Sequence, residues 1–239
     1  IVPECIELDT EILHQFHDRS KMMMGILPTG TVPHEPKQRL SSVFWSLPSH
    51  QLNNFLHNSQ AYSDWLNQVS KRWKPAADWL EQVIAQPEQK SQWLTANYRD
   101  VVLSKFSEGR IGVMGNAAHA MSPQLGQGAN MALLDAWALG QAVQSARKNE
   151  ALDYVQLWQT YHQHRQSSTA FYQFLSRLLT PLYQSELWWT GGLRDLSFAW
   201  MYRIPYFRKE MAVTISGLKL GMFSQMNYRD IAKQNNHSV

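Results

Sequence analysis

The most informative run in the chain is residues 109–132, which read GRIGVMGNAAHAMSPQLGQGANMA. Its first part is apolar and ends at a glycine, as a strand does when it leads into a tight loop. Small residues continue to Pro123, and a Gly-Gln-Gly turn then opens a segment with helical periodicity. Glycines at positions 126 and 128 let the backbone approach a ligand closely. The pattern predicts a strand, a loop and a helix, in that order.

The expected helix runs from about Gly128 to Ala146. Its free N–H groups and positive dipole end would face the loop, where they suit an anion or an electron-rich group. One face carries mostly small residues: Ala129, Ala132, Leu133, Ala136, Gly140 and Val143. A second apolar stripe consists of Met131, Leu134 and Ala138. We therefore expect burial on more than one side, with close packing against a sheet.

The whole run resembles the "GDAAH…P…GQG.N" segment of the class A FAD-dependent monooxygenases, the family of the aromatic-ring hydroxylases and p-hydroxybenzoate hydroxylase. The likeness extends through Asp135-Ala136 to Tyr161 and Arg165 on a later helix. The resemblance implies an α+β chain with a partial FAD/NAD(P)-binding fold. It also implies FAD as the cofactor, with NADH or NADPH as the co-substrate.

The resemblance implies contacts to FAD for eight residues. Gly115 is one of them, and Asn116 stands where the family has an aspartate that hydrogen-bonds the ribityl hydroxyls. Pro123 would line the flavin ring. Backbone groups would cradle the pyrimidine end of the flavin at Gly126, Gln127, Gly128, Ala129 and Asn130. The amide oxygen of Asn116 can still accept a hydroxyl proton, but without a carboxylate's charge we expect FAD affinity to fall by about 1 kcal/mol.

Other polar residues give weaker signals. His119 lies within the loop, where it would either shuttle protons or hold the loop by a hydrogen bond to the backbone. His14 and His17 are three apart but have no obvious third ligand, so no metal site is expected. No residue of the sequence can be named as the catalytic base.

One element of the family is missing from this sequence. No GxGxxG motif follows a strand, although that unit binds the pyrophosphate and adenosine of a dinucleotide. In the family it lies at the amino terminus, and this chain begins Ile1-Val2-Pro3 without a methionine. We expect the amino-terminal part to lie outside this chain, as a missing segment or as a partner chain.

Periodicity along the chain predicts its helices and strands, and the resemblance implies the parts to which they belong. These are a substrate-domain portion with a sheet and helices (1–100), the carboxyl-terminal part of an FAD-binding domain (101–146) and a helical region (147–239). Within them we expect a sheet over 21–50 with a connection at 28–36, helices over 51–86, strands over 100–106 and 111–114, and two helices over about 150–182 with Pro181 at the end of the second.

Composition narrows the partners and the compartment. Lys plus Arg is 22 and Asp plus Glu is 19, a net charge of +3 without a basic run, so nucleic acid is not an expected partner. The single cysteine, Cys5, excludes an intrachain disulfide and suits the cytoplasm. The last 50 residues are rich in aromatic and basic residues, which suit a membrane surface, but without a clean amphipathic period we expect packing on the same domain or in a homodimer.

The resemblance implies an FAD-dependent monooxygenase that hydroxylates an organic substrate, expected to be aromatic, with NADH or NADPH and O₂, and we expect the substrate to lie on the sheet of residues 22–45. Other activities of the same fold remain open, namely those of an epoxidase, a reductase or a halogenase. So do an inactive truncated chain and a non-enzymatic interaction module.

Overall fold

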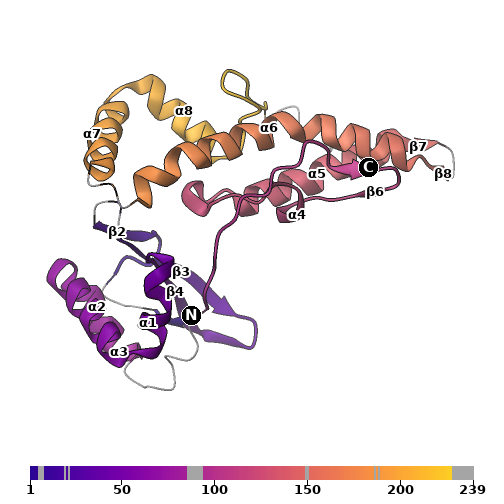
Figure 1. The fold of residues 1–239 in the computed structure, drawn as a ribbon. Helices are drawn as coiled ribbons and strands as arrows, with labels where there is room; N and C mark the ends of the chain where they lie inside the picture. The colour runs from indigo at the N-terminus through magenta and orange to yellow at the C-terminus, as the bar shows by residue number, and fades with distance from the viewer. Residues whose placement is uncertain are drawn as a thin grey trace. The chain divides into compact units, whose positions relative to one another are not determined.

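The computed structural model describes residues 1–4, 8–18, 20, 22–84, 94–148, 151–185, 187 and 189–227; Cys5 and Trp188 lie outside them. The chain divides into two compact units (Figure 1). Unit 1 comprises residues 1–96 and 183–192, and unit 2 comprises residues 97–182 and 193–239. The functional assignment of the three parts expected from sequence stays a prediction.

Unit 1 contains a four-stranded antiparallel sheet in the order β1-β4-β3-β2. Its strands are β1 (Val2–Pro3), β2 (His14–Asp18), β3 (Met22–Val32) and β4 (Glu35–Ser46). Alternation along β4 places Val43 and Trp45 against the hydrophobic core and Phe44 on the opposite face.

The predicted connection at 28–36 is wrong, because β3 and β4 continue through most of it. They pair as far as Val32 and Glu35, with shifts in register after Pro28 and Thr31. Strand β2 pairs with β3 only up to Ile26, so Pro28 lies where β3 has become an edge strand. An edge strand tolerates proline because the missing N–H has no neighbour to reach.

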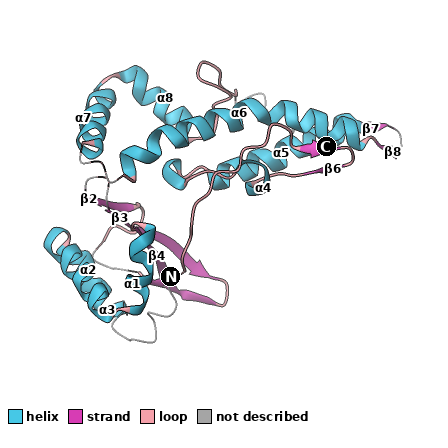
Figure 2. Ribbon diagram, viewed as in Figure 1, coloured by secondary structure: helices cyan, strands magenta, loops and turns pink. Residues whose placement is uncertain are grey.

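Helices cover one face of this sheet (Figure 2). They are η1 (Ser49–Gln51), α1 (Leu52–His57), α2 (Ser59–Arg72) and α3 (Lys74–Ile84). Asn58 caps α2 by accepting a hydrogen bond from the backbone N–H of Gln60 at 2.9 Å. Trp65 of α2 stacks on Trp45 of the sheet with ring centroids 4.7 Å apart. Trp65 is buried and belongs to the hydrophobic core of this unit.

Unit 2 is largely helical. Its elements are β5 (Ser107–Glu108), β6 (Ile111–Gly112), α4 (Asn116–His119), η3 (Pro123–Leu125), α5 (Gly128–Ala146), β7 (Arg147–Lys148), β8 (Ala151–Leu152), α6 (Tyr154–Tyr183), α7 (Thr190–Arg203) and α8 (Pro205–Ile215). The hairpin of β7 and β8 joins α5 to α6, and the two helices run side by side in Figure 1. The small residues Ala138, Ala142 and Ala146 pack with Leu157 and Tyr161 in the core between them.

Two predicted features of unit 2 differ from the structure. Residues 100–106 do not form a strand, and the strands that follow have two residues each. A β-strand is stabilised by backbone hydrogen bonds to a neighbouring strand. Here the backbone N–H of Val101 donates instead to the carbonyl of Ala120, in a loop, at 2.9 Å. Residues 154–183 form one helix, not two, and Pro181 lies in its last turn, where it removes a single hydrogen bond. No helix in the described part of the chain is long and apolar enough to cross a membrane.

Candidate functional site

The loop between β6 and α5 has a backbone that only glycine adopts easily. Gly115, at the start of α4, has φ of 60°, and Gly126, just before α5, has φ of 62°. L-residues with a side chain rarely take these values. The two glycines therefore fix the direction of the chain at both ends of the loop.

One side of this loop is open. A Cβ added to Gly115, Gly126 or Gly128 would meet no atom of the described chain within 4 Å. Asn116, Pro123 and Ala129 are also exposed. The structure thus leaves free space beside six of the eight residues predicted to bind FAD: Gly115, Asn116, Pro123, Gly126, Gly128 and Ala129. A flat, extended ligand fits such a surface because the backbone itself forms it.

The amino terminus of α5 has no side-chain cap. Gln127 occupies the capping position, but its side chain donates to the carbonyls of Leu125 and Ile215, at 3.2 and 2.8 Å. The first N–H groups of a helix have no partner within it, so those of Gly128 and Ala129 can donate to a ligand. With the helix dipole they favour negative charge at this point.

Gln127 and Asn130 are the two predicted site residues whose side chains turn into the protein. Asn130 Nδ2 donates to Oε1 of Gln127 at 3.1 Å and to the carbonyl of Ile215 at 3.2 Å. That carbonyl belongs to the last residue of α8. The end of α8 therefore holds the loop from behind through these two side chains, and only their backbone groups are left for a cofactor.

Asp135 of α5 is the centre of a buried polar cluster under the loop. Its Oδ2 accepts the backbone N–H of Gly115 and lies against Nε2 of His119, both at 2.8 Å. Its Oδ1 accepts Nε of Arg165 from α6 at 2.7 Å. Asp135 is 0% exposed and Arg165 is 1% exposed. One carboxylate thus joins the loop and two helices.

The charge of this carboxylate is stabilised by its partners. Burial by itself raises the pKa of Asp135, but hydrogen bonds from His119 and Arg165 and their charges outweigh it and hold the pKa below its ordinary value. Burial, followed by the charge of Asp135, raises the pKa of Tyr161. The cluster therefore contains an ionised acid at neutral pH and a tyrosine that stays neutral.

His119 has a structural environment. Its ring is buried and hydrogen-bonded to the Asp135 carboxylate. The sequence offered a role in which His119 holds the loop through a backbone partner, but the partner found is this side chain. Since a carboxylate only accepts, Nε2 must carry the proton. This arrangement favours the structural role of His119 over proton transfer with a ligand.

The sequence singled out Asp135 and Arg165 only as part of the family resemblance. The sequence feature that could have identified Asp135 is its position in the apolar stripe of α5, between Met131 and Ala138, which the structure buries. A charged residue in such a stripe requires a partner, because an unpaired buried charge is costly. No group of three or more possible metal ligands occurs among the described residues.

Comparison with known proteins supports the cofactor. A family model described as "FAD binding domain" matches residues 53–171. Zeaxanthin epoxidase from an Oncidium hybrid cultivar is 28% identical over 115 residues, which are 46% of this chain and 17% of that protein. The 2-heptyl-3-hydroxy-4(1H)-quinolone synthase of Pseudomonas aeruginosa is 37% identical over 92 residues, which are 38% of this chain and 22% of that protein.

A solved structure shares the fold. The crystal structure of tetracycline destructase Tet(51) superposes with a TM-score of 0.53 and 17% identity, covering 95% of this chain and 53% of the other. The chain thus spans about half of that structure, and its matches span about a fifth of the curated relatives. With the glycine loop and the family match, these likenesses lead to one assignment: the chain belongs to the class A FAD-dependent monooxygenase family.

Proposed function

We propose that this chain forms one side of the flavin site, and the substrate sheet, of an enzyme that oxygenates a small organic substrate with NADH or NADPH and O₂. The observation that carries the proposal is the uncapped amino terminus of α5 beside an open glycine loop. Bound FAD would supply the redox and oxygen chemistry, and the protein supplies binding and electrostatics.

The residues of the loop have separate tasks in this proposal. The N–H groups of Gly128 and Ala129 would donate to the pyrimidine edge of the flavin, where they stabilise negative charge. The exposed amide of Asn116 would accept a hydroxyl of the ribityl chain. Pro123 would lie against the ring and limit access of water. Asp135 acts from behind by fixing the N–H of Gly115 and the ring of His119.

The substrate surface we propose is the second face of the unit 1 sheet. Helices α2 and α3 cover the face that carries Met24 and Ile26. The opposite face carries Met23, Leu27 and Phe44, and none of these is fully buried. Gly25 has no side chain, which lets the ring of Phe44 lie across β3. The strand register adds polar residues to the same face, namely Gln15, His17, Ser42 and Ser46. The surface therefore combines apolar and aromatic groups with polar ones, which suits a planar organic substrate.

The outer face of α5 supports the proposal that a further segment completes the flavin site. Its small residues are exposed, including Ala132, Ala136 and Gly140, and a Cβ on Gly140 would meet no described atom within 4 Å. The sequence predicts that this face packs closely against a sheet. A dinucleotide-binding unit supplied by another segment or chain would provide that sheet.

Binding of FAD to the purified chain tests this proposal. The measurement is a titration of FAD followed by flavin fluorescence, with gel filtration and the visible spectrum to detect retained cofactor. Replacing Gly126 with Ala should raise the Kd at least tenfold, because the side chain strains the loop that holds the flavin.

The matched control is Gly109→Ala, which changes another exposed glycine with positive φ, of 58°, outside the loop. Gly109→Ala should lower the free energy of unfolding about as much as Gly126→Ala does and leave the Kd for FAD unchanged. Equal effects of both variants on FAD binding, or no binding by a folded chain even with an added amino-terminal unit, would refute the proposed site.

A further inference from the structure

Helix α7 carries an exposed apolar strip on the part that lies in unit 2. Leu193, Leu196 and Trp200 follow at i, i+3 and i+7, and Leu196 is 74% and Trp200 59% exposed. Residues at this spacing share one face of a helix. Arg203 continues the same face one turn later and is exposed as well. The strip therefore runs from leucine through tryptophan to a cation.

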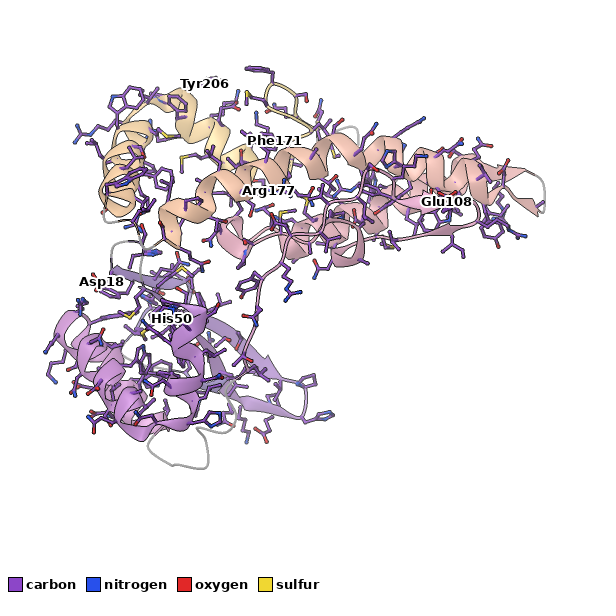
Figure 3. The ribbon with its side chains drawn as sticks, in the orientation of Figure 1. Asp18, His50, Glu108, Phe171, Arg177 and Tyr206 are labelled. Carbon is purple, nitrogen blue, oxygen red and sulfur yellow. The ribbon has the colours of Figure 1, made fainter. Side chains whose placement is uncertain are left out.

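Helix α8 contacts this strip at Trp200 and places basic side chains beside Tyr202, on another side of α7. The guanidinium of Arg208 lies 6.0 Å from the ring centroid of Tyr202, and the rings of Trp200 and Phe207 have centroids 6.0 Å apart. Tyr206, labelled in Figure 3, lies at the start of α8 and is exposed, as is Lys209. We call this the α7–α8 surface: Leu193, Leu196, Trp200, Tyr202, Arg203, Tyr206, Arg208 and Lys209.

The cations of the α7–α8 surface are not neutralised within the described chain. Both acids of these helices already have other partners, Asp195 with Arg194 at 2.7 Å and Glu210 with Lys219. No ion pair links an acid in the described ranges to Arg203, Arg208 or Lys209. The surface is thus apolar, aromatic and positively charged, so a complementary partner is both apolar and negatively charged.

We propose that the α7–α8 surface binds the surface of an anionic lipid membrane. Tryptophan and tyrosine are favoured at the level of the lipid headgroups, while leucines enter the acyl boundary. Arginine and lysine are attracted to anionic headgroups as their aliphatic stems cover apolar surface. The helices would lie in the plane of the interface, since no described helix is long and apolar enough to cross a membrane.

The charge argues against the other occupant of such a surface, a second protein surface. The cores of protein interfaces contain few charged residues, and cations there need acids opposite them. The uncovered face of α5 fits that description, because it is small and uncharged, but the α7–α8 surface does not. The inference goes beyond the proposed flavin chemistry, and its test needs no FAD.

Co-sedimentation of the full chain with lipid vesicles is the test. We expect binding to vesicles of equal parts phosphatidylcholine and phosphatidylglycerol, weaker binding at higher ionic strength, and little binding to pure phosphatidylcholine. The triple variant Arg203→Gln, Arg208→Gln, Lys209→Gln should lower the partition coefficient about 100-fold, since each cation contributes roughly fivefold. Trp200→Ala should lower binding further in either background.

The control triple variant is Lys37→Gln, Lys71→Gln, Lys105→Gln, which removes three exposed cations elsewhere. It has the same net charge as the first variant and should keep nearly full binding, with circular dichroism to confirm that both are folded. Equal loss in the two variants, equal binding to neutral vesicles, or no binding would overturn the proposal. A dimer that Trp200→Ala dissociates in ultracentrifugation would assign the surface to a second copy instead, and would also overturn it.

Discussion

The two sides of helix α5 are built from similar small residues, but their surroundings differ. The inner side is buried against the core and α6: Met131, Asp135, Ala138, Ala142 and Ala146. The outer side is exposed over its length: Ala129, Ala132, Leu133, Ala136, Gly140 and Val143. Only the inner side contains an ionised group, whose partners come from the loop and from α6. Small residues on a helix face therefore predict close packing, but on the inner side the polar contacts of Asp135 determine which elements pack there.

The largest effect should come from removing the charge on the inner side. Replacing Asp135 with Ala leaves the guanidinium of Arg165 buried without a counter-charge, and we expect this to cost about 3–5 kcal/mol. It also frees the N–H of Gly115 and the ring of His119. Urea unfolding followed by tryptophan fluorescence and circular dichroism would measure the loss.

The matched control is Asp100→Ala, which removes an ion pair of the same unit on the surface. Asp100 pairs with Arg177, labelled in Figure 3, at 2.8 Å, and the Arg177 side chain is 54% exposed. Such a pair contributes about 0–1 kcal/mol. If the two variants lose the same free energy of unfolding, the cluster around Asp135 does not determine how the inner side of α5 packs.

The same carboxylate predicts a dependence of stability on pH. The pKa of Asp135 is lowered in the folded state, so the unfolded chain binds its proton first. Its contribution is complete above the ordinary value of 3.8 and is lost as pH falls below it, through the lowered pKa. Wild type should therefore lose stability in acid more steeply than Asp135→Asn. Parallel acid titrations of the two proteins would contradict this.

The sequence predicted α5 with both of its ends, because the glycine turn before Gly128 and the periodicity up to Ala146 are local signals. Its expectation that the helix is buried on more than one side was wrong for the described chain, where only the inner side is buried. It did not reveal the bond from Asn130 to the carbonyl of Ile215, since 85 residues separate the two and a backbone acceptor leaves no pattern. The expected strand over 100–106 was wrong for a related reason: alternation predicts an extended chain, but a strand depends on its neighbours.

Leucine substitutions on the two sides compare them directly. Ala138→Leu inserts three carbon atoms into a fully buried site next to Tyr161, and we expect a cost of about 1–3 kcal/mol from overpacking. Ala136→Leu, on the exposed side, should change stability by less than about 0.5 kcal/mol. Urea unfolding of both variants checks the difference.

The exposed side should become sensitive when its partner is present. If an amino-terminal dinucleotide-binding unit packs on this face, Ala136→Leu should weaken its association with the chain, while the isolated chain remains unaffected. An unchanged association constant would show that the outer side of α5 is not the contact surface.

A smaller effect is expected where α8 supports the loop. Asn130→Ala removes two hydrogen bonds, to Gln127 and to the carbonyl of Ile215, which Gln127 still reaches. The loss of global stability should be about 1 kcal/mol. Amide exchange should become faster at Gly126, whose N–H donates to the carbonyl of Pro123 at 2.9 Å, whereas exchange at Gly109, outside the loop, should not change. Unchanged exchange in the loop would mean that α8 does not hold it.

The smallest change concerns the cofactor alone. Asn116→Asp restores the acid that the family has at this position, on an exposed side chain with no hydrogen bond among the described residues. A charged acceptor binds a ribityl hydroxyl more strongly than an amide, so the Kd for FAD should fall about fivefold, or about 1 kcal/mol. The control Asn97→Asp adds the same charge to an exposed residue outside the loop and should leave the Kd unchanged. An unaltered or higher Kd in Asn116→Asp would show that this side chain does not face the ribityl chain, even if the glycine loop binds the ring.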